Sequence, residues 1–473
     1  MSSISHILHD PADAFCALYD SEAANGIMSS VASWREEPGF NRFVEIVRTQ
    51  AVSGEYRLKG QPAGPREDNW SLDKRTAAHL YGLDAALMEA HPGRADVLGL
   101  SESLMRVSER YRMSASFCSA SVAGALVPRF AQPLDGPADH LDELFGSVMR
   151  LTPAVLAAVR ICVPADPGAP SAFRAWEPSM GLRVACAGFV ATPEDLEWRT
   201  YRRGRHACFT VSVREIPPVE ARIPRVLDAL DQSGAQIGVL PESVLSPRLL
   251  ELWRSAIQSR GKGSELRLLM PGTGNLLQCD PPSNIAILLD GQTGEEVLRA
   301  RKRHRFRLTA ASRSLYALEG EDEAPVSEDL DGGEEHEPLV VLDLPMGRLG
   351  MLICEDLAAV EHFAAPLASV GTSMLLVPVL SRPPGDSYRW EHRRAEAYTA
   401  RPGGTVVVSN SPAVALRLNM PMPVNTATVV NPYGTQLAST AGGEELAVFD
   451  LMPGTAPQLC DVSGRSGIAA IDE

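Results

Sequence analysis

The sequence predicts an α/β fold for its C-terminal part, preceded by a mainly helical N-terminal part. Three observations lead to this prediction. Apolar runs of strand length alternate with helical segments from about residue 205 onward. The runs that end near residues 242 and 354 are almost continuously apolar, as expected for strands that are buried on both faces. Residues 1–200 instead carry apolar residues mostly at helical spacing.

Length and composition bound the possible functions. The chain has 473 residues, which favours two domains. Its formal net charge of −15 disfavours nucleic acid and anionic membranes as partners. We expect no transmembrane helix and a cytoplasmic location, because the sequence has no run of about 20 apolar residues and no signal peptide. The eight cysteines form no CxxC pair and no zinc-spaced cluster, which predicts reduced thiols and no metal site.

The N-terminal domain is predicted to span residues 1–200. Ser71 is placed to cap a helix that carries Leu72, Leu80 and Leu87 at helical spacing. Residues 142–160 are also predicted to be helical, with Pro153 as an interruption or a restart. No catalytic motif is recognised in this part of the sequence, so its role stays open.

The C-terminal domain is predicted to span residues 205–452, followed by a tail at 453–473. A strand at 208–216 and a helix at 217–234 come first. Further strands are predicted within 235–242, 266–274, 283–290, 338–357, 373–380, 405–412, 425–434 and 445–451.

Glu242 stands at the C-terminal end of an apolar strand. The strand ends at Leu240, and Pro241 stops its hydrogen-bond ladder. Ligand sites in α/β sheets lie at that edge, so Glu242 is a candidate general base. The alternative interpretation is a surface carboxylate or a partner of a helix N-cap.

Cys354 also follows an apolar strand, and a helix is expected to begin directly after it. Free N–H groups and the helix dipole would lower the pKa of a thiol at such a position and would hold a developing oxyanion. A cysteine packed in the core is the alternative interpretation.

The third candidate segment is the basic run at residues 298–308. If this run is a strand, Lys302, His304 and Phe306 share one face and the arginines share the other. A lysine on the inner face would stabilise an oxyanion or tune the cysteine. A nucleic-acid patch is the weaker interpretation, because the chain as a whole is strongly acidic.

Three motifs follow one another in the chain: Glu242 in a PE strand end, Lys302 in a K-x-H strand and Cys354 in a G-x-x-x-C-x-D turn. In this order, the motifs resemble those of the nitrilase or carbon–nitrogen hydrolase superfamily. Residues 371–379, 393–410 and 425–440 resemble later segments of that family. The resemblance covers about 205–452.

The resemblance implies a four-layer α-β-β-α sandwich that associates through one helical face, so a homo-oligomer is expected. It implies that Cys354 is the nucleophile, Glu242 the general base and Lys302 the oxyanion stabiliser, helped by the Glu355 N–H. A thioester would form and water would resolve it, without a metal or an organic cofactor. The expected function is an amidase-type hydrolase that cleaves a non-peptide C–N bond of a small molecule.

Several features leave alternatives open. The family's second glutamate usually follows the lysine closely, but Glu319 is the first candidate here. The acidic segment 319–337 is interpreted as a solvated loop, with a lid over the site as the alternative. His304 would either orient a substrate or play a structural part.

The triplet at 354–356 is similar to the glutaminase domain of glutamine-dependent NAD synthetase, yet no SGGxDS-type segment follows. Acyl transfer to an amine, and a catalytically impaired binding or regulatory protein, are the alternative functions.

Overall fold

The structure, a computed structural model, divides the chain into two compact units. Unit 1 comprises Met1–Ala169 and Asp343–Gly347, and unit 2 comprises Pro170–Leu342 and Arg348–Glu473. The structure describes residues 8–21, 24, 26–65, 69–90, 100–129, 141–163, 181–190, 192–260, 263–309, 313, 316, 318, 325–333, 337–344, 346–382, 390–399, 404–440, 445–460 and 468–470.

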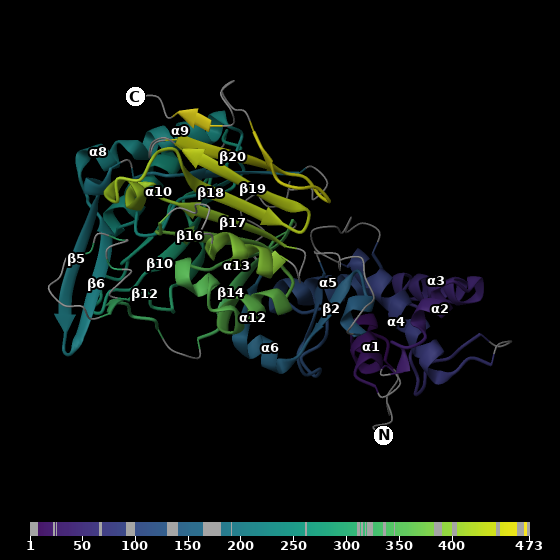
Figure 1. Cartoon of the computed structure of the whole chain (residues 1–473). Coiled ribbons are helices and arrows are strands. Elements are labelled where there is room, and N and C mark those ends of the chain that lie inside the picture. Colours follow the sequence, from purple (N-terminus) through teal and green to yellow (C-terminus); the bar gives the residue numbers. More distant parts are fainter. Residues whose placement is uncertain are drawn as a thin grey trace. The chain divides into compact units, whose positions relative to one another are not determined.

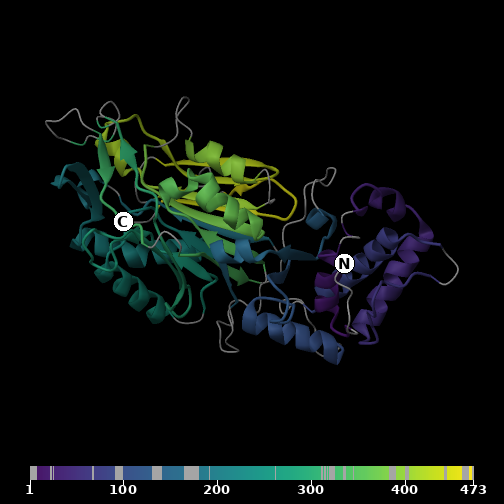
Figure 2. The ribbon, with the colours of Figure 1, turned by 90° about the horizontal axis from the view of Figure 1, so that it is seen from below.

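Helices make up most of the regular secondary structure that the structure describes in unit 1. Its helices are α1 (Pro11–Tyr19), α2 (Val31–Arg35), α3 (Pro38–Val52), α4 (Leu72–Glu89), α5 (Glu102–Ser114) and α6 (Pro153–Ala158), with a short 3-10 turn at Leu141–Leu144. The Ser71 hydroxyl accepts a hydrogen bond from the Lys74 N–H at 3.2 Å and so caps α4, as predicted. The helix α4 packs against α1 and α3, among the purple and blue ribbons of Figure 2.

The predicted helix at 142–160 is wrong over part of its length. Residues Val148–Leu151 form the strand β2, which pairs antiparallel with β1 (Ala125–Pro128). A third short strand, β3 (Val159–Cys162), follows α6. The pairing with β1 buries the Val148 and Leu151 side chains, and this tertiary contact overrides the local helical pattern.

The first sheet of unit 2 has the strand order β11-β10-β8-β7-β4-β20-β21. These strands are β4 (Leu182–Ala187), β7 (Ile237–Val239), β8 (Leu268–Met270), β10 (Ile285–Asp290), β11 (Glu296–Arg301), β20 (Glu445–Leu451) and β21 (Gln458–Leu459), with β9 (Thr273–Gly274) on β10 and β22 (Ile468–Ala470) on β20. Strands β4, β7 and β8 run parallel, and β7 and β8 are buried throughout. The helices α9 (Arg222–Gln232) and α10 (Pro247–Arg260) share a hydrophobic core with this sheet. The short helix α8 (Pro217–Glu220) precedes α9 in the chain.

Within unit 2, the second sheet has the strand order β19-β18-β17-β16-β15-β14. Its strands are β14 (Leu339–Leu344), β15 (Gly347–Met351), β16 (Thr372–Val379), β17 (Thr405–Asn410), β18 (Val424–Asn431) and β19 (Gly434–Thr440). The helices α12 (Ala365–Ser369) and α13 (Trp390–Thr399) lie against β16 to β18 (Figure 1), and a short helix, α14 (Ala413–Arg417), follows β17. The Ser409 hydroxyl of β17 donates to the Val239 carbonyl of β7 at 3.0 Å, which joins the two sheets.

A third, four-stranded sheet has the order β12-β13-β6-β5. Its strands are β5 (Leu196–Arg203), β6 (His206–Val213), β12 (Arg307–Leu308) and β13 (Val326–Glu328). The teal β5–β6 hairpin runs along one side of unit 2 in Figure 1. Its two-residue turn contains Gly204 at φ +60°, the left-handed conformation that tight hairpin turns require.

Two predicted boundaries differ from the structure. β4 and β5 precede residue 205 but belong to unit 2, because β4 pairs with β7 and β20 and because β5 pairs with β6. The segment 453–473 contains β21 and β22, which pair with β20, so it is not a separate tail. In both cases, hydrogen bonds from distant strands decide the boundary.

The helices among the described residues are of ordinary length. The 18-residue helix α4 carries charged side chains. None of the described helices is long and apolar enough to cross a membrane.

Candidate active site

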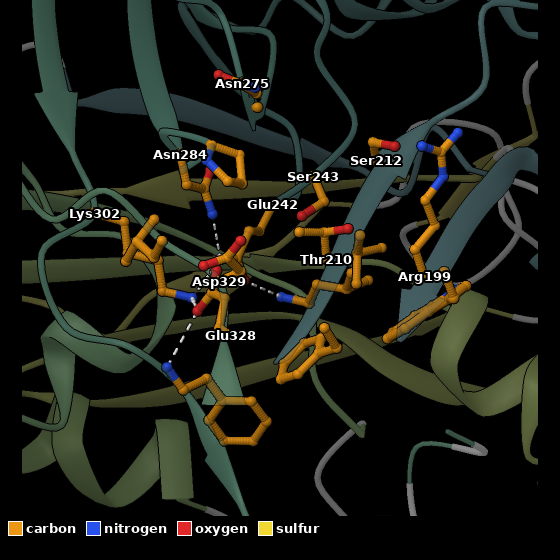
Figure 3. Close-up of a pocket in the computed structure, with 18 of the residues that line it drawn as sticks. Arg199, Thr210, Ser212, Glu242, Ser243, Asn275, Asn284, Lys302, Glu328 and Asp329 are labelled. Atoms are coloured by element: carbon orange, nitrogen blue, oxygen red, sulfur yellow. Dashed lines mark hydrogen bonds and ion pairs between the residues drawn. The ribbon is translucent and has the colours of Figure 1, made fainter. Parts of the chain in front are cut away.

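Unit 2 contains a cavity of ≈ 530 Å³ in which the predicted residues Glu242, Lys302 and Cys354 meet. They follow the strands β7, β11 and β15, which lie far apart in sequence. Figure 3 shows Glu242, Lys302 and Glu328 close together, with Thr210 and Ser212 of β6 opposite them. Two sheets of unit 2 thus supply the polar end of the cavity, and the β5–β6 hairpin supplies a wall.

Glu242 is a buried carboxylate with a partner on each oxygen. It lies in the turn after β7 and is 3% exposed. Its Oε1 atom accepts hydrogen bonds from Lys302 Nζ and Asn284 Nδ2, each at 2.8 Å. Its Oε2 atom accepts one from the Leu380 N–H at 3.0 Å. Burial raises the pKa of Glu242, against the opposing effect of the Lys302 ammonium. A proton acceptor held this rigidly, with a raised pKa, suits a general base.

Lys302 is a buried cation that bridges two carboxylates. Its Nζ atom donates to Glu242 Oε1 at 2.8 Å and to Glu328 Oε2 at 2.6 Å. Burial lowers the pKa of Lys302, but Glu242 and Glu328 outweigh that effect and hold the pKa well above its ordinary value. Lys302 therefore stays charged at neutral pH and offers a fixed positive charge to the cavity.

Sequence reasoning missed Glu328, the second carboxylate that contacts Lys302. It ends the strand β13, inside the acidic segment 319–337, which is predicted to be a loop or a lid. Glu328 Oε2 also accepts a hydrogen bond from the Phe306 N–H at 3.1 Å. The one available signal was the short Val326–Glu328 run of strand character within that segment. The predicted candidate, Glu319, lies outside the described residues.

The β5–β6 hairpin holds Glu328 in place through the next residue, Asp329. β6 pairs parallel with β13, and the Asp329 N–H donates to the Phe209 carbonyl at 2.8 Å. The buried Asp329 carboxylate accepts hydrogen bonds from the Tyr201 hydroxyl and from Arg203 Nε, the latter at 2.9 Å. The hairpin therefore forms a wall of the cavity and also fixes the strand that carries Glu328.

Cys354 lies just beyond β15, at a sharp turn in the backbone. Its φ of +49° is the left-handed conformation, which non-glycine residues rarely adopt and which is often found at functional sites. The side chain is buried, with 4% exposure.

The predicted helix after Cys354 is wrong. A single 3-10 turn at Cys354–Leu357 follows, then a π-helical turn, and α12 begins only at Ala365. The predicted fall in the thiol pKa is also wrong, because burial and the Glu242 carboxylate raise the pKa of Cys354 well above its ordinary value. The resting thiol is protonated and must lose its proton as it attacks.

The side chains of the other predicted site residues, His304 and Glu355, are not among the described groups that line the cavity. The strand predicted at 298–308 ends at Arg301, so its alternation does not extend to His304. The His304 side chain is exposed. Glu355 follows the nucleophile candidate, and burial raises the pKa of its carboxyl.

Asp356 ties the turn at Cys354 to the loop after Lys302. Its buried carboxyl accepts hydrogen bonds from the His304 N–H at 2.7 Å and from the Arg303 N–H at 3.2 Å. Burial raises the pKa of Asp356 to about 7, against the effect of these hydrogen bonds. The aspartate of the predicted C-x-D turn therefore positions the backbone beside Lys302.

Raising the pH from about 5 to about 7 is expected to destabilise the fold, in part through Asp356. Its carboxyl binds a proton in the native state up to a pKa of about 7, but in the unfolded chain only up to the ordinary value of 3.8. The stability gained from that proton is complete below the lower value and is lost as the pH rises through the higher one, by at most about 1.4 kcal/mol per pH unit. Urea unfolding between about pH 5 and pH 8 measures the slope.

Asp356→Asn should flatten that slope, because the amide oxygen still accepts both N–H groups but cannot ionise. Asp228→Asn, at an exposed position of α9, serves as the control and should keep the wild-type slope. An unchanged slope in Asp356→Asn would contradict the assignment.

Comparisons with known proteins find similarity to solved structures only. No family model and no curated protein matches the chain. One similar solved structure is a mutant of the amidase from Nesterenkonia sp. AN1, which shows covalent addition of the acetamide moiety of fluoroacetamide at its active site cysteine. Its sequence is 19% identical to this chain, and the TM-score is 0.39. The match covers 58% of this chain and 91% of that chain.

Two further solved structures are similar over a comparable share of the chain. A CN-hydrolase superfamily protein from Xanthomonas campestris is 14% identical, with a TM-score of 0.33, and the match covers 58% of this chain and 91% of that one. A glutamine-dependent NAD⁺ synthetase from Acinetobacter baumannii is 12% identical, with a TM-score of 0.35 and coverage of 57% and 45%. Solved structures similar to part of this chain therefore include nitrilase-superfamily amidases and a CN-hydrolase superfamily protein.

Proposed function

We propose that unit 2 is an amidase-type carbon–nitrogen hydrolase that acts through a cysteine thioester. The observation that carries this proposal is the meeting of Cys354, Glu242 and Lys302 in one cavity, with Glu328 as the second carboxylate on the lysine. Two joined sheets, with α9 and α10 on one and α12 and α13 on the other, support the predicted four-layer α-β-β-α sandwich.

The proposed first step is attack by Cys354 Sγ on the carbonyl carbon of an amide. Because the resting thiol is protonated, Glu242 takes its proton as the S–C bond forms. The carbonyl oxygen gains negative charge, which the Lys302 ammonium stabilises. The Glu355 N–H is a second donor in this proposal, because N–H groups at the start of a helical turn have no partner within the turn.

The C–N bond then breaks, and Glu242 returns its proton to the departing nitrogen, so that ammonia or an amine leaves. The acyl group stays on Sγ as a thioester. Water attacks this thioester while Glu242 accepts a proton from it, the carboxylic acid leaves, and the proton returns to Sγ. Glu328 keeps Lys302 between two carboxylates throughout, which fixes the ammonium toward the cavity.

Glu328 weighs against the alternative of a catalytically impaired binding protein. That alternative drew on the lack of a glutamate soon after Lys302 in the sequence. A carboxylate does contact the lysine, that of Glu328, and this contact supports the catalytic alternative.

The proposal is tested by ammonia release from a panel of small primary amides, with acid quenching and peptide mass mapping of the thioester. We expect ammonia release and an acyl adduct confined to Cys354, both lost in Cys354→Ala. Cys186→Ala is the matched control: Cys186 is a buried cysteine of β4, and burial raises its pKa to about 12. Ammonia release that survives in Cys354→Ala, or an adduct on another cysteine, would contradict the proposal.

A further inference from the structure

The wall of the cavity is rich in charged groups, and carboxylates are in excess. Among the residues that the structure describes, three cations line it, namely Arg199, Arg203 and Lys302. Five carboxylates of the same described part line it, namely Glu197, Glu242, Asp280, Glu328 and Asp329. Three positive charges against five negative ones give the lining a formal charge of −2. A cavity lined by one excess sign of charge concentrates ligands of the opposite sign.

Each of these three cations already has a carboxylate partner among the described residues. Arg199 bonds both oxygens of Glu197, at 3.0 and 2.9 Å. Arg203 bonds Asp329 and also pairs with Asp280 at the exposed rim. Lys302, as described above, lies between two carboxylates. An anionic group on a substrate would therefore have to displace a carboxylate from one of these cations.

The uncharged part of the wall also favours a cation. Phe209 of β6, Phe306 and Tyr316 line the cavity and form edge-to-face pairs, with ring centroids 6.5 and 5.4 Å apart. Tyr201 of β5 adds another aromatic side chain to the lining, while the Trp198 ring of the same strand already lies 5.0 Å from the Arg417 guanidinium. Aromatic faces attract ammonium and guanidinium groups and give no such attraction to carboxylates.

We propose that the substrate is an amide whose acyl part carries a cationic group, an ammonium or a guanidinium. This inference rests on the amidase function proposed above and deepens it. The amide end reaches Cys354, and the cationic end lies toward the hairpin wall, where Asp280 and Asp329 share Arg203 and where the aromatic side chains are. Amides with a carboxylate at the same end are rejected.

The test uses three primary amides with the same pentamethylene chain, which ends in an ammonium, a methyl or a carboxylate group. At low ionic strength, we expect kcat/KM for the ammonium compound to exceed that for the methyl compound by about tenfold, and the carboxylate compound to be about tenfold poorer than the methyl compound. Salt should reduce both ratios. An ammonium compound that is no better than the methyl compound, or a carboxylate compound that is the best of the three, overturns the inference.

A substitution in the hairpin tests which groups reject anions. Glu197→Gln removes the carboxylate that holds Arg199 and leaves a free guanidinium at the wall. The ratio of kcat/KM for the carboxylate compound to that for the methyl compound should then rise about fivefold or more. Glu251→Gln is the matched control, because Glu251 pairs with Arg254 on α10 and neither residue lines the cavity. An equal ratio in Glu197→Gln and Glu251→Gln overturns the assignment of this ion pair.

A second measurement separates this inference from the proposed reaction. Each compound is also tested for how well it protects Cys354 against alkylation by iodoacetamide, which needs binding but no turnover. If none of the three amides is hydrolysed, the proposed function fails for this series, while the order of protection still decides the charge preference. Strongest protection by the ammonium compound supports the inference, and equal protection by all three overturns it.

Discussion

Lys302→Met is expected to lower kcat/KM for an amide by about 10²- to 10³-fold, the loss typical when a preorganised oxyanion donor is removed. The lysine is 2% exposed and lies between Glu242 and Glu328, so its charge is held in a water-poor site where electrostatic interactions are strong. Methionine fills a similar volume but supplies no charge and no N–H donor. Steady-state kinetics on the hydrolysed amide measure the loss.

The same substitution should change the pH dependence in a defined direction. Without Lys302, Glu242 loses the ammonium charge that lowers its pKa, so its carboxyl holds its proton to a higher pH. Because Glu242 acts as a base only when ionised, the acid limb of kcat/KM should move to higher pH. The free energy of unfolding should also fall, by up to about 3–5 kcal/mol if no proton is taken up. If the pH profile of kcat/KM in Lys302→Met kept the wild-type acid limb, the proposed effect of Lys302 on Glu242 would be contradicted.

Lys74→Met is the control for Lys302→Met. Lys74 pairs with Glu37 and lies over the Trp70 ring in unit 1, outside the cavity. The substitution Lys74→Met should leave kcat/KM unchanged, together with the acid limb of its pH profile. A loss of activity in Lys74→Met as large as in Lys302→Met would show that general destabilisation, and not the missing oxyanion donor, explains the result.

Glu242→Gln is expected to lower kcat/KM by about 10²- to 10⁴-fold, because the general base is lost while the side chain keeps its size. The thiol of Cys354 is protonated at rest, and no other proton acceptor is assigned to it in the proposed mechanism. Alkylation of Cys354 by iodoacetamide near neutral pH should therefore slow as well. The fall of the alkylation rate at low pH, which comes from protonation of Glu242, should disappear. Peptide mass mapping over a pH series follows this rate for each cysteine separately.

A glutamine at position 242 also cannot accept all the hydrogen bonds that the Glu242 carboxylate accepts. Lys302 and Asn284 donate to one carboxylate oxygen, and the Leu380 N–H donates to the other. An amide has one acceptor atom and one donor group, so one donor of the pocket is left facing another, at a cost of about 1–3 kcal/mol. Glu251→Gln on the exposed face of α10 should show neither effect. Alkylation of Cys354 at the wild-type rate in Glu242→Gln would remove the base from the mechanism.

The strand ends that carry Glu242 and Cys354 could be predicted from the sequence. In each case, an apolar run long enough for a buried strand leads into a chemically active side chain, and this pattern is local. β20 occupies the predicted residues 445–451, and β17 begins where the predicted strand 405–412 begins. Lys302 was found from a basic run, although the strand that precedes it ends at Arg301 and not within that run.

The environment of Cys354 could not be predicted in the same way. A helix after the strand would have lowered the pKa of the thiol, but a 3-10 turn and full burial beside Glu242 raise it. Burial depends on which segments pack around the sulfur, and those segments come from β7, β11 and β13 rather than from the neighbouring sequence. The direction of the pKa shift is therefore a property of the assembled site.

The sequence by itself determined the alternation of strands and helices in unit 2 and the three strand-end residues Glu242, Lys302 and Cys354, because period, polarity and chain order are encoded locally. Only the tertiary structure decided the place of Glu328 and the cavity wall. Glu328 lies in an acidic segment whose composition indicates a loop, and it reaches Lys302 because β13 pairs with β6 and because Asp329 bonds to Arg203 of the hairpin. Such contacts join segments more than a hundred residues apart, and no local pattern specifies which distant strand supplies the missing hydrogen bonds.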